Sequence, residues 1–313
     1  VNHDCQLLLL AHFSDGSTSD VTNAATWQTS DEAVVRVLNS PGSKGVIRGL
    51  SVGKAIISAA YNGFTATTEV SVTEAVPDPL GNDAKVVLLH HSTGLRIWSG
   101  GVPAWFTDYN SRLGTSYSIV EQPFPLSEGN DPYNYWDIWV NSAGTGSDGG
   151  GPRLESLTKE FDVMIFKHCY PVSDIEPDTG YPDISSSIRR IENYKLQYEA
   201  LKEKMKEFPG NRFIVWTGAA LVRNATTEEE GRRAHDFFEW VKNEWDVPGD
   251  NIYIWDFYQL ETDGGYYLKD EYAESPYDSH PNQDFSARVA PYLCIRILDV
   301  IEGSGDFGSL TGQ

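Results

Sequence analysis

The chain has 313 residues with a formal net charge of −21, and 40% of its residues are hydrophobic and 12% aromatic. This length accommodates about two domains of ordinary size, with enough apolar residues for well-packed cores. The negative charge argues against a nucleic-acid partner, because phosphate binding requires clustered Lys and Arg. No run of about 18 apolar residues occurs, so we expect no membrane insertion.

Short runs rich in Val, Ile, Leu and Thr alternate with turn signals over residues 1–74. The runs are "CQLLLLAHF", "AVVRVLN", "GVIRGL", "KAIISAAY" and "TATTEVSVT", and between them lie "SDGS", "SPGSKG" and "YNG". This spacing predicts an antiparallel β-sandwich. The segments "FSDGSTSDVTNAATWQTSDEAVVRV" and "GVIRGLSVGKAIISAAYNGFTATTEVSV" resemble a bacterial immunoglobulin-like domain of group 2, over residues 5–73. The resemblance implies a secreted or cell-surface protein, whose module could associate with a cell surface or a polysaccharide.

A different pattern follows residues 75–84, which we interpret as a linker because they carry two prolines and a glycine. Five short apolar runs alternate with helical stretches over residues 85–313, which predicts a parallel sheet covered on both faces. The runs are "KVVLL", "YSIV", "DVMIF", "RFIVW" and "NIYIWDF", and the clearest helices are expected at 183–208, with Asp183 as the cap, at 226–245 and at 284–301.

The stretch "KVVLLHHSTGLRIW", residues 85–98, carries a polar cluster to the end of a predicted strand. Ligands of open α/β sheets bind at the carboxyl ends of the strands, so Ser92 could be a nucleophile. The alternative is a helix cap, because Ser and Thr after a strand often satisfy the free N–H groups of the next helix. Taken alone, these residues favour the cap.

Other segments shift the balance toward a nucleophile. "VVLLHHSTG", "FDVMIFKHCYP", "RFIVWTGAALVRNATTEEEGRRAHDFFEWV" and "DSHPN" together resemble the sequence blocks of SGNH, or GDSL-like, serine hydrolases over residues 85–302. The resemblance implies a three-layer, flavodoxin-like domain with a five-stranded parallel sheet. It also implies that Ser92 is the nucleophile and that His280 is its base. A serine hydroxyl needs such a base within hydrogen-bond reach, and a third group usually orients the base.

The third member of this predicted triad is open. The family usually places Asp three residues before His, whereas Asp278 lies two residues before His280 and Tyr277 occupies the usual position. Asp278 is the first candidate, and a backbone carbonyl or Glu274 could serve instead.

The oxyanion hole is open as well. In the family, the serine N–H, a glycine and an asparagine stabilise the developing negative charge. The Ser92 N–H carries over directly, and Gly129 is the candidate glycine. No asparagine occurs in "FKHCYPVSDI", so Lys167, His168 or Ser173 could donate in its place.

Several other features favour structural roles. We expect His90 and His91 to make structural hydrogen bonds, since adjacent residues on a strand point to opposite faces and would rarely bind one metal ion. The glycine-rich residues 144–153 lack the ending of a phosphate-binding loop and the spacing of a calcium loop, so we interpret them as a flexible loop. The cysteines, Cys5, Cys169 and Cys294, match no zinc or disulfide pattern, although one pair could form. We expect no metal and no cofactor.

The aromatic run "NDPYNYWDIW" with Trp98 could build a wall for stacking sugar rings, with Tyr133 and Trp136 as contacts. Core packing is the competing explanation for such a run. The sequence therefore predicts an extracellular serine esterase that removes O-acetyl groups from carbohydrate or another small ester. A lipase or general carboxylesterase of the same fold, and a non-catalytic adhesion or carbohydrate-binding protein, are the alternatives.

Overall fold

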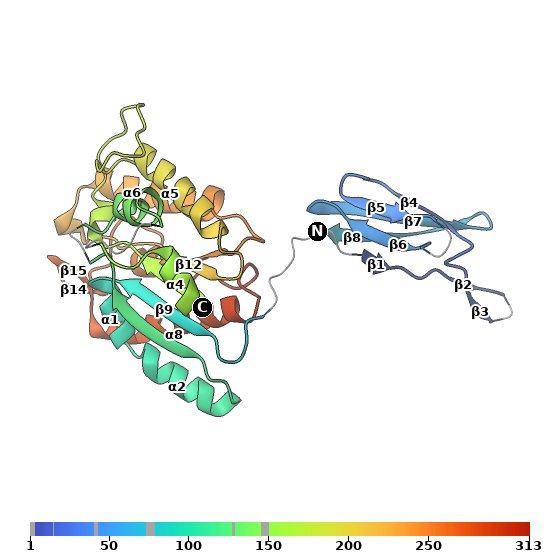
Figure 1. The fold of residues 1–313 in the computed structure, drawn as a ribbon, viewed down its shortest axis with the longest axis horizontal. Coiled ribbons are helices and arrows are strands. Elements are labelled where there is room, and N and C mark those ends of the chain that lie inside the picture. Colours follow the sequence, from blue (N-terminus) through green and yellow to red (C-terminus); the bar gives the residue numbers. More distant parts are fainter. Residues whose placement is uncertain (1–3, 15, 41–42, 73–78, 127–128, 145–149) are drawn as a thin grey trace. The chain divides into compact units, whose positions relative to one another are not determined.

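The computed structural model describes residues 4–14, 16–40, 43–72, 79–126, 129–144 and 150–313. The chain forms two compact units, Val1–Val76 and Pro77–Gln313 (Figure 1). Each unit has hydrophobic clusters of its own. No described helix combines the length and the apolar character that crossing a membrane would require.

The N-terminal unit is built from antiparallel strand pairs, as its turn spacing predicts. Its described strands form three sheets. They pair in the orders β1-β6-β5, β4-β7-β8 and β2-β3. Alternate residues of β7, Ala55, Ile57 and Ala59, are buried with Trp27 and Ile47 in one cluster. The strands are β1 Asp4–Gln6, β2 Leu10–His12, β3 Thr18–Asp20, β4 Thr26–Thr29, β5 Val35–Leu38, β6 Val46–Gly49, β7 Gly53–Tyr61 and β8 Phe64–Val72.

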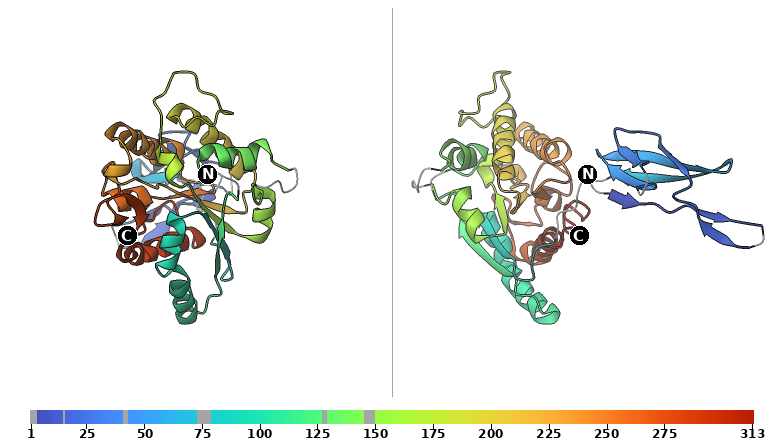
Figure 2. Two further views of the ribbon diagram at one scale, coloured as in Figure 1. Left: turned by 90° about the vertical axis from the view of Figure 1, so that its left-hand side faces the viewer. Right: turned by 45° about the vertical axis from the view of Figure 1, so that its right-hand side comes forward.

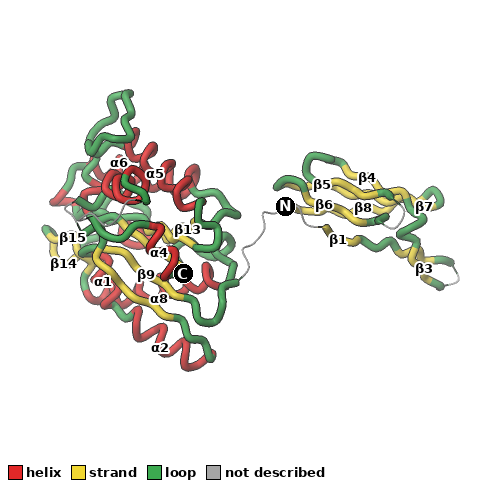
Figure 3. Tube along the Cα trace, viewed as in Figure 1, coloured by secondary structure: helices red, strands yellow, loops and turns green. Residues whose placement is uncertain are grey.

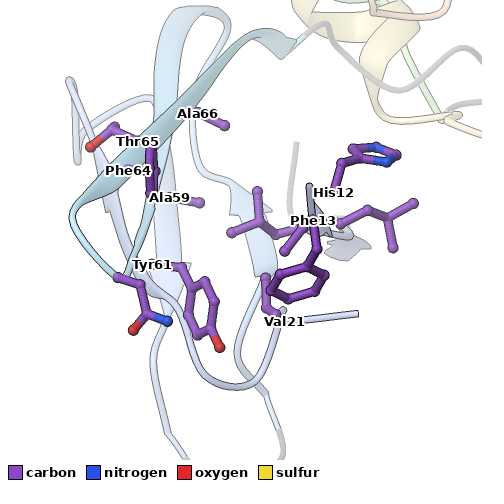
Figure 4. Close-up of a pocket in the computed structure, with 12 residues that line it drawn as sticks. His12, Phe13, Val21, Ala59, Tyr61, Phe64, Thr65 and Ala66 are labelled. Atoms are coloured by element: carbon purple, nitrogen blue, oxygen red, sulfur yellow. The ribbon is translucent and has the colours of Figure 1, made fainter. Parts of the chain in front are cut away.

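A groove of about 320 Å³ lies in this unit beside β2 and the β7–β8 hairpin (Figure 4). Its lining is mainly apolar and includes Leu10, Phe13 and Phe64. His12 also lines the groove, and its Nδ1 is hydrogen-bonded to Thr18 Oγ1 at 3.0 Å. None of the candidate catalytic residues lines this groove.

The second unit contains the predicted five-stranded parallel sheet. Its strands are β9 Lys85–His90, β10 Ser118–Pro123, β11 Val163–Lys167, β12 Arg212–Trp216 and β13 Ile252–Trp255, and they pair in the order β10-β9-β11-β12-β13. Numbered within the unit this is the order 2-1-3-4-5, one of the two common orders of doubly wound sheets, in which ligands bind where the strand order reverses. Here that point lies between β9 and β11.

Helices cover both faces of this sheet, which explains why β9, β11, β12 and β13 are buried almost throughout and do not alternate. The edge strand β10 differs, because exposed residues interrupt it. Val87 and Leu89 belong to one core cluster and Val86 and Leu88 to the other, so successive side chains of β9 enter opposite layers. Helices α1 Thr93–Ser99, α2 Val102–Leu113 and α8 Gln283–Ile301 pack on one face (Figures 1 and 2). Helices α3 Pro132–Trp136, α4 Leu154–Glu160, α5 Ile191–Lys206 and α6 Glu228–Trp240 pack on the other. The sheet separates the two helix layers (Figure 3).

One further helix, α7 Phe257–Thr262, follows β13. The prediction of a helix from 183 was wrong at its start, because α5 begins at Ile191. Asp183 is not its cap. Its carboxylate accepts hydrogen bonds from the Ser185 N–H and hydroxyl at 2.9 and 2.7 Å, and Ile188 is 43% exposed.

The predicted linker, 75–84, overlaps the second unit. Residues 75–78 lie outside the described part of the chain. The Leu80 N–H donates to the Ile301 carbonyl at 2.8 Å, at the end of α8, and Ala84 is buried in the core. Residues from Leu80 onward therefore belong to the α/β unit, because they contribute hydrogen bonds and apolar contacts to it.

Candidate active site

Ser92 occupies a sharp turn between β9 and α1. Its backbone has φ +48° and ψ −98°, a combination that costs a non-glycine residue on the order of 1–3 kcal/mol. A Cβ on Gly94 would lie 2.4 Å from His90 Cβ, so only glycine allows α1 to start this close to the strand. Ser92 takes the N-cap position, but its side chain makes no capping hydrogen bond. The capping interpretation is therefore wrong, and the hydroxyl is available at the carboxyl end of the sheet.

The Ser92 hydroxyl is instead hydrogen-bonded to His280 Nε2, although the two residues are 188 positions apart in the sequence. On the other side of the ring, His280 Nδ1 lies 2.5 Å from Asp278 Oδ1. Three side chains that the sequence nominated for catalysis thus form a continuous chain of hydrogen bonds. This is the geometry that a serine, a base and an orienting carboxylate require.

A short hairpin explains the two-residue spacing between Asp278 and His280. It consists of β14, Ala273–Ser275, and β15, Asp278–Pro281, and the sequence did not predict it. Side chains two apart on a strand share a face, so the Asp278 carboxylate can reach the His280 ring, which in turn contacts Ser92. Ser279 between them is buried, and its hydroxyl accepts a hydrogen bond from the Val222 N–H at 3.0 Å.

Two hydrogen bonds favour the ionised form of the Asp278 side chain. It accepts the His280 backbone N–H at 3.0 Å in addition to the imidazole, and these two hydrogen bonds hold the pKa of Asp278 below its usual value. The side chains of Asp278 and His280 remain 43% and 30% exposed, so solvent can reach the pair. Glu274, the alternative third member, is exposed on β14, and the ring nitrogen it would need is occupied by Asp278.

Tyr170, which the sequence reasoning missed, packs its ring edge-on against His280. The ring centroids are 5.3 Å apart at an interplanar angle of 83°. Burial raises the pKa of its hydroxyl, so Tyr170 is a neutral phenol beside the base. Its position just after β11, at the sheet edge where Ser92 also lies, is the signal that could have identified it.

The two histidines before Ser92 make hydrogen bonds away from it. His90 Nε2 lies 2.9 Å from Glu121 Oε2, and His91 Nε2 is hydrogen-bonded to the Pro125 carbonyl. Burial and, to a smaller extent, the neighbouring Lys167 lower the pKa of His90.

Two of the side chains considered for the oxyanion hole are engaged elsewhere. Ser173 donates its hydroxyl hydrogen to the Ala219 carbonyl at 2.6 Å, so the proposal of Ser173 as a donor is wrong. His168 lies fully buried with Nε2 2.9 Å from the Tyr198 hydroxyl, inside the helix layer that contains α5. Burial lowers its pKa to about 3, which keeps the ring neutral and makes His168 a core residue.

Gly129, the candidate glycine donor, has φ +96°, and a Cβ there would lie 2.6 Å from the Asn134 side chain. The residue must therefore be glycine, and its role as a donor stays a prediction. The Ser92 N–H has no acceptor among the described residues. Lys167 contacts the backbone just before Ser92: its Nζ lies 3.4 Å from the His91 carbonyl oxygen.

The aromatic run after Gly129 is mainly core. Tyr135 and Trp139 are fully buried, and Trp136 is 8% exposed with its ring 5.8 Å from that of Tyr133. Trp98 is half-buried against the other core cluster. The prediction of an exposed sugar-stacking wall was therefore wrong for Trp136, because its ring is almost completely covered.

Within the described part of the chain, no group of three or more His, Cys, Asp or Glu side chains could hold a metal ion. Residues 145–149 of the glycine-rich loop lie outside it. Cys5, Cys169 and Cys294 are free thiols, so the pairing left open by the sequence does not occur.

No family model matches the chain. It is 35% identical over 71 residues to ice-binding protein 1 of Shewanella frigidimarina, a stretch that covers 22% of this chain and 8% of that protein.

Solved structures resemble the chain only distantly. A gut microbial diltiazem-metabolizing enzyme is 14% identical with a TM-score of 0.39, over 71% of this chain and 48% of that one. A Bacteroides fragilis protein described as an alpha-galactosidase/melibiase is 12% identical with a TM-score of 0.20, over 70% of this chain and 48% of that one. The chain thus spans about half the length of these two structures, and TM-scores of this size do not establish a common fold.

Proposed function

We propose that the α/β unit is a serine ester hydrolase of the SGNH, or GDSL-like, kind. The observation that supports it is the continuous hydrogen-bonded chain Ser92–His280–Asp278. Residues at two ends of the unit meet there, at the carboxyl edge of a parallel sheet where such folds bind ligands.

The chemistry follows from this geometry. His280 Nε2 takes the Ser92 proton while the hydroxyl oxygen attacks the ester carbonyl, and the Ser92 N–H faces the resulting oxyanion. His280 then gives the proton to the departing alkoxide, which leaves as the alcohol. Water then loses a proton to the same nitrogen and attacks the acyl-serine carbonyl. The bond from the acyl carbon to the Ser92 oxygen breaks, the carboxylic acid is released, and His280 returns the proton to the Ser92 oxygen. Asp278 holds the ring in the tautomer that exposes Nε2 and stabilises the imidazolium.

For the substrate we propose O-acetyl groups on carbohydrate. The proposal rests on the resemblance of the N-terminal unit to a surface module, which also suggests a secreted or cell-surface location and contact with a polysaccharide. An acetyl esterase has a shallow acyl pocket, so rates should fall from acetate to butyrate to octanoate esters. Rates that rise with chain length would assign the site to the lipases, since each buried methylene contributes about 0.8 kcal/mol.

Covalent labelling tests the nucleophile directly. A fluorophosphonate should modify Ser92, identified by peptide mass spectrometry, and p-nitrophenyl acetate should be hydrolysed. Ser92→Ala should abolish both, whereas Ser99→Ala, on the exposed end of the same helix, should leave both unchanged. Absence of labelling and of turnover in the wild-type protein would favour a non-catalytic binding protein.

A further inference from the structure

Lys167 is a buried lysine next to the turn that carries Ser92. It is the last residue of β11, and its side chain is completely buried. Its Nζ lies 3.4 Å from the carbonyl oxygen of His91. The same oxygen accepts the Gly94 N–H at 2.9 Å, in the first turn of α1.

That carbonyl belongs to the peptide group whose N–H is the Ser92 N–H. In a planar trans peptide, the C=O and the N–H point in opposite directions, so a cation at the oxygen lies on the far side from the hydrogen. A positive charge there draws electron density toward the oxygen and leaves the hydrogen more positive. We propose that Lys167 is a positioning residue that polarises the His91–Ser92 peptide and strengthens the Ser92 N–H as an oxyanion donor.

This inference rests on the proposed function and deepens it. It also replaces direct donation by Lys167, which the sequence left open, because the ammonium contacts the carbonyl side of the peptide and not the N–H side.

Among the described residues, no carboxylate forms an ion pair with Lys167 Nζ, so the His91 carbonyl does not compete with one for this group. Glu261 is also fully buried, with one oxygen accepting the Ala220 N–H at 2.7 Å. Burial lowers the pKa of Lys167, an effect that the neighbouring Cys169 and Glu261 oppose, and burial also raises the pKa of Glu261. The Trp216 ring, 5.9 Å from Nζ, adds a weaker favourable contact.

Lys202 provides a matched control in the same unit. It is buried, its Nζ donates to the Trp245 carbonyl, and that indole ring lies 5.5 Å away. Lys167→Met and Lys202→Met therefore remove the same group from similar surroundings, but only one of the carbonyls belongs to the nucleophile's turn.

The test compares both variants in the full-length chain with an acetate ester. Lys167→Met should lower kcat by about 10-fold with KM within about twofold, less than the ~100- to 1,000-fold lost with a whole oxyanion donor. Lys202→Met should lower stability without this change in kcat. Equal kcat values for Lys167→Met and the wild type would overturn the proposal, and so would a loss confined to KM.

Two further readouts separate polarisation from a structural defect. The affinity of an arylboronic acid, whose serine adduct places a negative oxygen in the hole, should fall by the same factor as kcat. The Ser92 amide proton should move upfield in the NMR spectrum of Lys167→Met; an unchanged resonance would refute polarisation.

The remaining outcomes are also decisive. If Lys167→Met does not fold, Lys167→Gln retains a polar group of similar reach without the charge. If neither folds, the wild-type spectrum decides, because a Ser92 amide proton at or upfield of its random-coil position contradicts the proposal. Failure of wild-type labelling and turnover would refute the proposed function, and this inference with it.

Discussion

At the scale of single residues, local backbone geometry places the reactive groups. The strained turn at Ser92 projects its hydroxyl from the sheet edge, and the two-residue period of β15 aligns Asp278 with His280. The two-residue spacing from Asp278 to His280, which departs from the usual family pattern, is thus compatible with a hydrogen bond between them, because both lie on a strand.

Asp278→Asn should lower kcat by about 10⁴-fold, because the amide no longer stabilises the imidazolium or selects the productive tautomer. The loss should be smaller than that of Ser92→Ala, which removes the atom that forms the bond. Glu274→Gln is the control, and initial rates with p-nitrophenyl acetate should stay within about twofold of wild type. A greater loss at Glu274 than at Asp278 would show that the wrong carboxylate has been assigned.

Asp246 should make the protein less stable as the pH rises. Burial, with help from the nearby Asp250 and Asp306 charges, raises its pKa to about 7. The unfolded value is about 3.9, so the folded state holds the proton more tightly. The stabilisation is complete below about pH 4 and is lost as the pH rises through 7.

The Tm of Asp246→Asn minus the Tm of the wild type should therefore increase between pH 5 and pH 8. The exposed Asp270→Asn serves as the control and should show a constant difference. A Tm difference for Asp246→Asn that is independent of pH would contradict the raised pKa.

At the scale of elements, helix termini show which local signals are reliable. The acids at 228–230 predict the start of α6, and Thr227 caps it by a reciprocal capping box: the Thr227 hydroxyl accepts the Glu230 N–H at 3.2 Å, and the Glu230 carboxylate accepts the Thr227 N–H at 2.9 Å. Asp183, an equally good cap residue, closes a turn instead.

Thr227→Ala should lower the free energy of unfolding by about 1 kcal/mol, because one N–H at the start of α6 loses its partner. Chemical denaturation of the full chain measures the change. Thr107→Ala, on an exposed position inside α2, should leave stability nearly unchanged. Equal losses for the two variants would mean that the capping box contributes nothing specific.

At the scale of the whole molecule, the two units have separate cores. The cluster around Trp27 contains residues of the first unit alone, and the two clusters flanking the parallel sheet contain residues of the second. Each unit therefore has what a domain needs to fold independently.

A fragment of residues 79–313 should fold and hydrolyse p-nitrophenyl acetate with kcat/KM within about twofold of the full chain. It retains Leu80, whose N–H bonds to the end of α8, and every member of the candidate site. Circular dichroism and initial rates provide the measurements. A fragment that aggregates or loses its cooperative transition would contradict the independence of the units.

Most of the fold could be predicted from the sequence, because burial on both faces leaves a direct trace in composition. All five apolar runs became strands of the parallel sheet, and the turn spacing of residues 1–74 corresponds to antiparallel pairs. The helical period failed at 183–190, where hydrogen bonds of Asp183 with Ser185 compete with a helix.

The candidate site was only partly accessible to sequence reasoning. The resemblance to SGNH hydrolases nominated Ser92, His280 and Asp278, whereas the residues around Ser92 taken alone favoured a helix cap. Only the tertiary structure decided that the Ser92 hydroxyl is hydrogen-bonded to His280 and does not cap α1. It also decided that Ser173 donates to the Ala219 carbonyl and that the Tyr170 ring packs against His280. The direction of a side chain depends on what packs around it, and those neighbours come from distant parts of the chain.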